Sequence, residues 1–116
     1  MSILEDKSYK FAIRIVKLNR YLCSEHKEYV LSKQLLRSGT AVGALVAEAQ
    51  YAQSKADFIN KLQVSLKEAN ESRYWLRLLE ECDYLTKKML ESILADIEEL
   101  IKMLVSSINT TKQKLK

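Results

Sequence analysis

Three glutamates come nearest to a catalytic or metal-binding arrangement in this chain of 116 residues. Glu68 and Glu71 are three residues apart and Glu48 lies on the preceding helical stretch, so paired helices would bring their carboxylates together. Carboxylates that meet inside a helical bundle hold metal pairs in di-iron proteins, but such sites also contain Glu-x-x-His pairs. The only histidine, His26, belongs to no such pair. We therefore expect these carboxylates to form salt bridges that set the helix register, with the cations Arg37, Lys61 or Arg73.

The rest of the chain lacks the usual signatures of catalysis. It contains no glycine-rich phosphate loop and no serine–histidine–aspartate set. Cys23 and Cys82 lack ligand spacing and lie among apolar residues, which predicts buried free thiols in a reducing compartment. His26 falls in a short charged connection, where a lone histidine is expected to be a surface residue. We predict a protein that is not an enzyme, has no catalytic residues and needs neither a cofactor nor a metal.

A row of basic residues is the pattern that points to a charged ligand. One narrow sector of the first helical stretch holds the cations Lys7, Lys10, Arg14 and Lys17. The net charge is +4, with 19 Lys and Arg against 15 Asp and Glu. The row is a candidate site for the phosphates of RNA or DNA, and the alternative is a solvated outer face. Because Tyr21 is the one aromatic beside the row, we expect any nucleic-acid contact to be directed at the backbone rather than at the bases.

The composition predicts that helices position these residues. The chain has no proline and two glycines, and clusters of turn-forming residues are nearly absent. Apolar residues recur at helical spacing over four stretches, about residues 8–26, 29–52, 55–81 and 87–110, with Ser54 and Thr86 as expected N-caps of the last two. Such helices on short links fold as an all-α, antiparallel up-down four-helix bundle, expected to be a single domain over residues 1–116. A kink near Ser38 and Gly39 is an open alternative to one continuous second helix.

The sequence also predicts where the protein is found. No apolar run approaches the roughly 18 to 20 residues of a membrane span. The N-terminal residues lack the basic segment and apolar core of a signal peptide. We therefore expect a cytoplasmic protein that does not enter a membrane.

Two helical surfaces hold more apolar or small side chains than a lone bundle is expected to cover. The apolar arc of the first stretch spans about 220°, against the stripe of about 100° that a surface helix needs, and includes Phe11, Ile13 and Val16. On the second stretch, small residues four apart let another helix approach closely, at Gly39, Gly43 and Ala47. Each glycine lowers helix stability by roughly 1 kcal/mol, which close packing would offset. We predict a homo-oligomer, and the alternative is a monomer with an unusually tight core.

Four separated blocks occur in a recognisable order along the first three stretches. They are Lys27-Glu-Tyr-Val-Leu-Ser-Lys-Gln-Leu-Leu-Arg-Ser-Gly-Thr-Ala-Val-Gly-Ala, Glu48-Ala49, Ser54-Lys-Ala-Asp-Phe-Ile-Asn-Lys-Leu and Lys67-Glu-Ala-Asn-Glu-Ser-Arg-Tyr-Trp-Leu-Arg-Leu-Leu. With these blocks the chain resembles the bacterial four-helix-bundle family of 23S rRNA intervening-sequence proteins. The resemblance covers roughly residues 9–79 closely, and the fourth stretch only in its pattern.

The resemblance implies a four-helix bundle that assembles into a ring-like homopentamer. It also implies kinship with the accessory variability protein of diversity-generating retroelements, a basic pentameric barrel that binds nucleic acid and a reverse transcriptase. The intervening-sequence proteins themselves have no established biochemical role, and their genes lie in insertions within ribosomal RNA genes.

Two functions from different classes follow. The first is an oligomeric protein that binds RNA or DNA through the repeated basic row, since ring symmetry multiplies a weak local charge by avidity. The second is a structural or adaptor module whose ring recruits a protein partner without touching nucleic acid.

Overall fold

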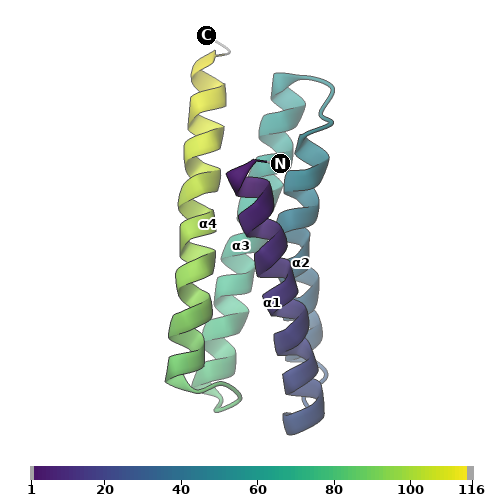
Figure 1. Cartoon of the computed structure of the whole chain (residues 1–116), viewed down its shortest axis with the longest axis vertical. Coiled ribbons are helices and arrows are strands. Elements are labelled where there is room, and N and C mark those ends of the chain that lie inside the picture. The colour runs from purple at the N-terminus through teal and green to yellow at the C-terminus, as the bar shows by residue number, and fades with distance from the viewer. Residues whose placement is uncertain (1, 115–116) are drawn as a thin grey trace.

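The computed structural model describes residues 2–114, and in this range it contains four α-helices and no strand. They are α1 (Ile3–His26), α2 (Leu31–Ala49), α3 (Lys55–Glu81) and α4 (Lys87–Lys114). Successive helices run in opposite directions, which gives an elongated up-down bundle of 50 × 21 × 21 Å (Figure 1). The predicted all-helical fold with four helices is confirmed for the described part of the chain.

The first helix begins earlier than the expected start near residue 8. Ser2 and Glu5 form a capping box: the Ser2 Oγ accepts a hydrogen bond from the Glu5 backbone N–H at 3.1 Å, and the Glu5 Oε1 accepts one from the Ser2 N–H at 3.1 Å. These two bonds satisfy backbone donors that a helix start leaves free, so the helix extends back to Ile3. The predicted start near residue 8 was wrong because the prediction followed the apolar periodicity and did not use the capping box of Ser2 and Glu5.

Other boundaries differ by smaller amounts. Helix α2 is shorter than the expected 29–52, and α4 continues to Lys114 instead of ending near residue 110. The limits of α3 agree with the sequence, and the Ser54 Oγ accepts from the Asp57 N–H at 3.0 Å as its cap. Thr86 caps α4 by accepting from the Met89 N–H at 3.1 Å. Helix α2 runs through Gly39 without a break, so the alternative of a kinked second helix is not needed.

Apolar side chains from all four helices fill the centre of the bundle. Those less than 2% exposed include Phe11, Ile15, Leu22, Leu35, Val42, Leu62, Leu76 and Leu104. Buried serines join α2 to α3 within this core: the Ser65 hydroxyl donates to the Val42 carbonyl at 2.8 Å, and the Ser72 hydroxyl donates to the Ser38 Oγ at 2.9 Å. These hydrogen bonds satisfy the buried hydroxyl groups, and the small size of serine allows the two helices to lie close together.

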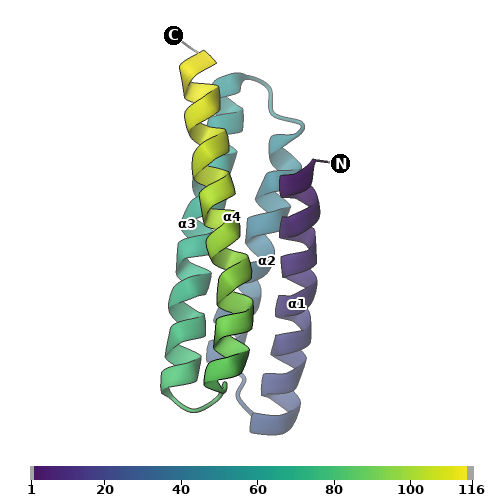
Figure 2. The same cartoon turned by 60° about the vertical axis from the view of Figure 1, so that its left-hand side comes forward.

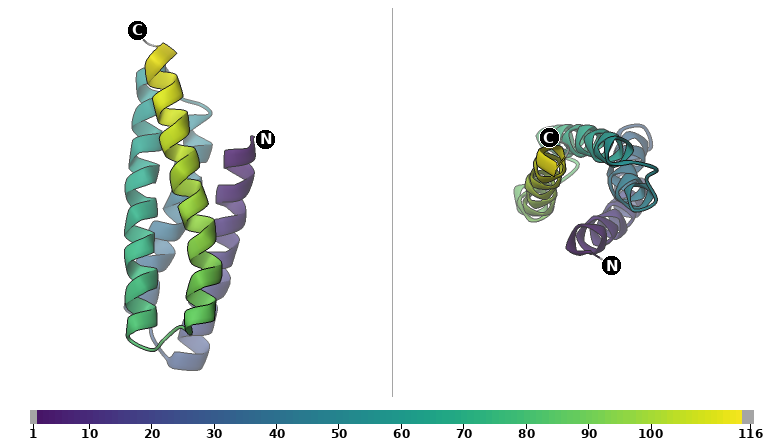
Figure 3. Two further views of the ribbon diagram at one scale, coloured as in Figure 1. Left: turned by 90° about the vertical axis from the view of Figure 1, so that its left-hand side faces the viewer. Right: turned by 90° about the horizontal axis from the view of Figure 1, so that it is seen from above.

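The four helices do not surround the core evenly. Helix α2 packs closely on both α1 and α3, and α3 packs closely on α4, whereas α1 and α4 touch least of the neighbouring pairs. A turned view shows α4 lying against α3, with α1 beyond α2 on the other side (Figure 2). Seen from above, the helices form a C whose opening lies between α1 and α4 (Figure 3). Helix α4, the last helix, therefore does not pack tightly against α1, and the bundle is loosest on that side.

The glycine stripe of α2 is used inside the chain, against α1. A Cβ built on Gly39 would lie 2.7 Å from the Cγ1 of Ile15 and 2.9 Å from its Cγ2. A Cβ on Gly43 would lie 3.0 Å from the backbone oxygen of Ser8. Ala47, the third member of the stripe, is exposed. The two glycines therefore set the distance between α1 and α2.

A buried glutamate caps α2, whose own N-cap residue, Val30, makes no side-chain cap. The Glu28 carboxylate accepts hydrogen bonds from the backbone N–H groups of Ser32 at 2.7 Å, Leu31 at 3.1 Å and Val30 at 3.2 Å. Burial by itself would raise the pKa of Glu28, but these three hydrogen bonds outweigh it and lower the pKa. The negative charge also lies at the positive end of the helix dipole.

We expect Gly39→Ala to lower the free energy of unfolding by about 1 to 3 kcal/mol, because the added methyl group overlaps Ile15. An exposed glycine in a helix would show the opposite sign, since alanine favours the helix by about 1 kcal/mol. Denaturant unfolding measures the change, and Gln34→Ala, at an exposed position of the same helix, is the control. A Gly39→Ala protein as stable as the parent would contradict the close approach of α1.

We expect Glu28→Gln to destabilise the protein by about 1 kcal/mol near neutral pH through loss of the charged cap. Because folding lowers the pKa of Glu28, its stabilisation is fully present above the ordinary value of 4.5 and is lost as the pH falls through the lower folded value. The stability difference between parent and variant should therefore shrink on acidification below 4.5. Glu25→Gln, at an exposed residue whose side chain forms no hydrogen bond among residues 2–114, is the control and should be nearly as stable as the parent at neutral pH.

Candidate nucleic-acid interface

The basic row predicted on the first helix lies along the seam between α1 and α4. The Lys7 Nζ lies 2.8 Å from the Glu99 Oε1, and the Arg14 Nη1 lies 2.6 Å from the Asp96 Oδ2. The Arg14 Nη2 also donates to the Ser92 Oγ at 3.0 Å. Three members of the row thus have carboxylate partners, since Lys10 pairs with Asp6 on its own helix at 3.0 Å.

These ion pairs reduce the charge that the row presents to a ligand. The pKa of Lys7 is raised by its hydrogen bond to Glu99 and by the charge of the same carboxylate. Three of the four cations of the row lie within ion-pair distance of a carboxylate. Lys17 is the member without such a pair in the described part of the chain. A phosphate approaching the row would have to compete with these carboxylates.

A second basic surface, which the sequence analysis did not identify, lies on the outer side of α3. It consists of Lys67, Asn70, Arg73, Tyr74 and Arg77, which we call the α3 face. Its lower part is a groove of about 500 Å³ that Leu78 and Glu81 also line. Among residues 2–114, none of its three cations forms an ion pair, and the Arg73 Nη2 donates to the Asn70 Oδ1 at 2.9 Å. The α3 face therefore offers cations that no carboxylate occupies.

An exposed aromatic ring accompanies these cations. Tyr74 is 60% exposed and meets the ring of Trp75 edge-on, with 5.1 Å between the ring centroids. Spacings of three and four residues place Lys67, Asn70, Tyr74 and Arg77 on one side of the helix, and this pattern could have been read from the sequence. We missed it because acidic residues that point elsewhere interrupt the basic ones along the chain.

The carboxylates between α2 and α3 form the expected salt bridges in part. Arg37 pairs with Glu68 at 2.9 Å and also with Glu71. The Trp75 indole N–H donates a hydrogen bond to Glu71 at 3.0 Å and lowers the pKa of that carboxyl. Partial burial raises the pKa of Glu71, but the hydrogen bond and charge of Arg37 lower it further, so the net effect is a lowered pKa. Glu48 is exposed and takes no part, so the expectation that it joins these carboxylates was wrong.

The lone histidine and the two cysteines also differ from expectation. His26 is the last residue of α1 and is half-buried: its Nε2 lies 3.1 Å from the Tyr21 hydroxyl, and its ring meets that of Tyr84 at 5.6 Å. Cys82 is exposed and Cys23 is partly buried, so the prediction of two buried thiols was wrong. Cys82 lies at the C-cap of α3, where the chain leaves the bundle core.

The wide apolar arc of α1 is divided between the core and the outer surface. Phe11 is buried within the chain, so its candidate role as a packing residue is met inside the bundle. Ile13 and Tyr9 stay exposed, and with Ala12 and Val16 they form an apolar outer strip beside Lys17 and Arg20, with a shallow hollow of about 370 Å³. We call this the α1 outer face.

Two kinds of feature are absent from residues 2–114. No helix there is long and apolar enough to cross a membrane. No group of three or more histidine, cysteine, aspartate or glutamate residues there is arranged to hold a metal ion.

Comparisons with known proteins identify relatives by sequence and by structure. The sequence profile of the 23S rRNA-intervening sequence protein family matches residues 2–106. A crystal structure from Bacteroides thetaiotaomicron VPI-5482, described as a protein with unknown function from the S23 ribosomal protein family, is 55% identical to this chain. The match covers 91% of this chain and 98% of that one, with a TM-score of 0.91. No curated protein matches.

Proposed function

Since the chain belongs to the 23S rRNA-intervening sequence protein family, we propose that it is a non-enzymatic homo-oligomer that binds the backbone of RNA or DNA. The family name refers to inserted segments of ribosomal RNA, which makes a nucleic acid the ligand to test first. The pentameric ring, the kinship with the accessory variability protein of retroelements and the cytoplasmic location stay predictions from the sequence.

The main support for this proposal is the α3 face. Lys67, Arg73 and Arg77 are basic residues without an ion pair among residues 2–114, and one carboxylate, Glu81, lies at the end of their groove. Cations that are free to meet phosphates release the counterions of the nucleic acid on binding, and this release favours the complex. Tyr74 adds a ring on which an unpaired base can stack, so single-stranded RNA is the favoured form.

The basic row of α1 is the second candidate surface. Lys7, Lys10, Arg14 and Lys17 contribute to binding only to the extent that phosphates displace Asp6, Asp96 and Glu99 from their ion pairs. Exposed ion pairs of this kind stabilise a protein by at most about 1 kcal/mol, so a nucleic acid with several phosphates can displace them. The two surfaces therefore predict different responses to removal of the α4 carboxylates: affinity rises if the basic row is the site and changes little if the α3 face is.

Self-association is the second part of the proposal, and the α1 outer face supports it. Ile13 and Tyr9 expose apolar area that a neighbouring copy would cover. Several copies in one assembly present several α3 faces to one nucleic acid, and linked weak sites bind much more tightly than one. If the α1 outer face instead takes a different protein, the chain is the adaptor that the sequence analysis named as the alternative.

We expect Arg73→Glu/Arg77→Glu to abolish binding of a short single-stranded RNA, measured by fluorescence anisotropy at several salt concentrations. The parent affinity should fall steeply with salt, and the slope should flatten in weaker charge variants such as Arg77→Gln. The control Lys33→Glu/Lys55→Glu changes the net charge equally at exposed residues away from the α3 face and should bind nearly as the parent does. Equal losses in both variants would show a response to net charge alone and would contradict a site on α3.

We expect Asp96→Asn/Glu99→Gln to leave RNA affinity within about twofold of the parent if the α3 face is the site, allowing for the general effect of charge. A rise of tenfold or more in the same anisotropy assay would show that Lys7 and Arg14 form the site once their partners are removed. Absence of RNA and DNA binding by the parent protein at low salt would refute the nucleic-acid proposal.

We expect light scattering to give a mass several times the 13.4 kDa of one chain, and Ile13→Asp to reduce it. Val105→Asp is the matched control, because Val105 on α4 is 41% exposed and Ile13 is 40% exposed. A parent protein that stays at 13.4 kDa at high micromolar concentration would exclude self-association.

A further inference from the structure

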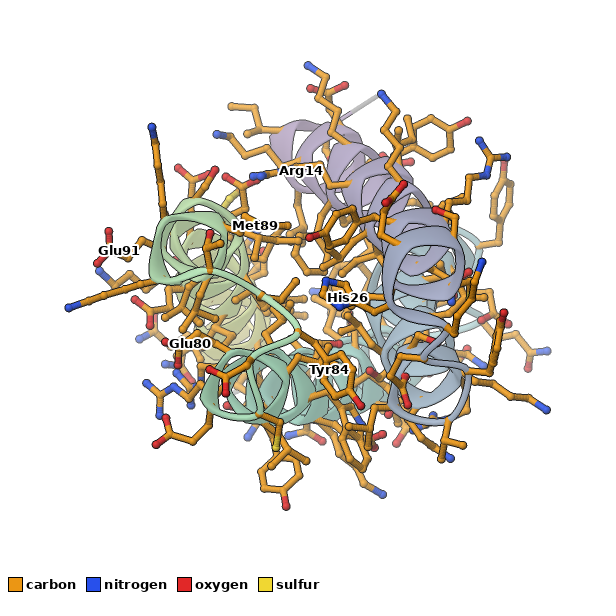
Figure 4. The ribbon with its side chains drawn as sticks, turned by 90° about the horizontal axis from the view of Figure 1, so that it is seen from below. Arg14, His26, Glu80, Tyr84, Met89 and Glu91 are labelled. Atoms are coloured by element: carbon orange, nitrogen blue, oxygen red, sulfur yellow. The ribbon has the colours of Figure 1, made fainter. Side chains whose placement is uncertain are left out.

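A cleft between α1 and α4 has the features of a binding site that the proposed function does not use. It has a volume of about 520 Å³, within the range of roughly 300 to 1,000 Å³ typical of small-molecule sites. One wall is the second half of α1 and the other is the first half of α4. Figure 4 shows Met89 on the side of α4 that faces α1, and Glu91 on the opposite side.

The floor and walls of the cleft are mainly apolar. Leu85 and Ile93 form the floor and are each 4% exposed, while Leu18 and Met89 are partly buried on the two walls. These side chains belong to the part of the bundle where α1 and α4 fail to pack closely. An apolar ligand in the cleft would therefore remove surface from water that the chain alone leaves accessible, at about 25 cal/mol for each Å².

Side-chain contacts lie at both ends of the cleft. Arg14 reaches from α1 to Asp96 and Ser92 of α4 at the upper end. At the lower end, His26 lies between Tyr21 and Tyr84, and Figure 4 shows the His26 and Tyr84 side chains there. The cleft is open to solvent between these two ends, but they limit its length, so a small molecule fits it better than a partner helix, which needs a groove along its whole length.

The charged residues at the cleft are all of one sign. Arg14, Lys17 and Lys88 are among its lining residues, and no aspartate or glutamate is. Arg14 is already paired with Asp96, whereas Lys17 and Lys88, which come from opposite walls, form no ion pair among residues 2–114. Apolar walls with unpaired ammonium groups on both sides complement a ligand that has an apolar body and one negative group.

We propose that this cleft binds a small amphiphilic anion of the medium-chain carboxylate class. The hydrocarbon chain lies against Leu18, Met89 and Ile93, and the carboxylate lies between the ammonium groups of Lys17 and Lys88. The site is separate from the α3 face, but it shares Arg14 and Lys17 with the basic row of α1 and Lys17 with the hollow of the α1 outer face. Its direct test therefore reads Met89, which belongs to none of those surfaces.

Methionine methyl NMR on the full chain tests the site directly, because Met89 lines the cleft and Met103, also on α4, does not. We expect decanoate, titrated below its micelle concentration, to shift the Met89 methyl signal saturably and to leave the Met103 signal in place. Decanol should bind about tenfold more weakly and decyltrimethylammonium more weakly still, since the two lysines favour a negative head group.

Charge variants give the second arm of the test. Lys17→Glu/Lys88→Glu should weaken decanoate binding by tenfold or more, and Lys17→Gln/Lys88→Gln should weaken it less. Lys33→Glu/Lys102→Glu, with the same change of net charge at exposed residues outside the cleft, should bind decanoate as the parent does.

Three results would overturn the proposal. The first is a Met89 signal that decanoate does not move, and the second is equal binding of the three head groups, which would indicate a purely apolar contact. The third is a Met89 signal that moves with protein concentration alone, accompanied by a change of mass in light scattering, because it would show that a second copy fills the cleft.

Discussion

The close approach of α1 to α2 is the contact on which the other features of this protein depend. Gly39 leaves room for the Ile15 side chain, and Gly43 leaves room for the backbone at Ser8. These two contacts fix both the distance between the helices and the rotation of α1 about its own axis. Once α1 is set in this way, Phe11 and Ile15 face the core, Lys7 and Arg14 face α4, and Ile13 faces outward. The ion-paired seam, the cleft and the α1 outer face all follow from that single setting.

The side of the bundle between α1 and α4 shows the consequence of unequal packing. Helix α2 takes up the small-residue contact on one side and the buried serine contacts to α3 on the other, so α1 and α4 are left as the loosest pair. Lys7 and Arg14 span the gap with ion pairs that are partly exposed to water. Such pairs contribute little to stability and do not exclude solvent as apolar packing does. A pocket with an apolar floor and basic walls remains where the side chains do not meet.

Charge is distributed differently in space from its pattern along the chain. The basic row of α1 was visible as a periodic pattern, but its partners Asp96 and Glu99 lie some eighty to ninety residues later and come close only through the fold. The three cations of the α3 face, in contrast, are separated in sequence by acidic residues such as Glu71, which turns inward to Arg37 and Trp75. The pattern of charges within one helix therefore overestimated the free positive charge of the basic row on α1 and did not reveal the α3 face. The difference lies in which carboxylates each helix meets, and helical periodicity contains no information on that.

The sequence by itself determined the four helices, four of their eight limits and the family, because these depend on local capping, on apolar periodicity and on blocks of residues in order. Ser54 and Thr86 mark helix starts through hydrogen bonds to residues three positions away, which any reader of the chain can identify. It also identified the glycine stripe as a place of close packing. Only the tertiary structure decided that α1 occupies the stripe and that Cys82 and Glu48 lie in solvent. The physical reason is that burial and ion pairing depend on distances between helices that are far apart in the chain, and these distances are set by the packing of all four at once.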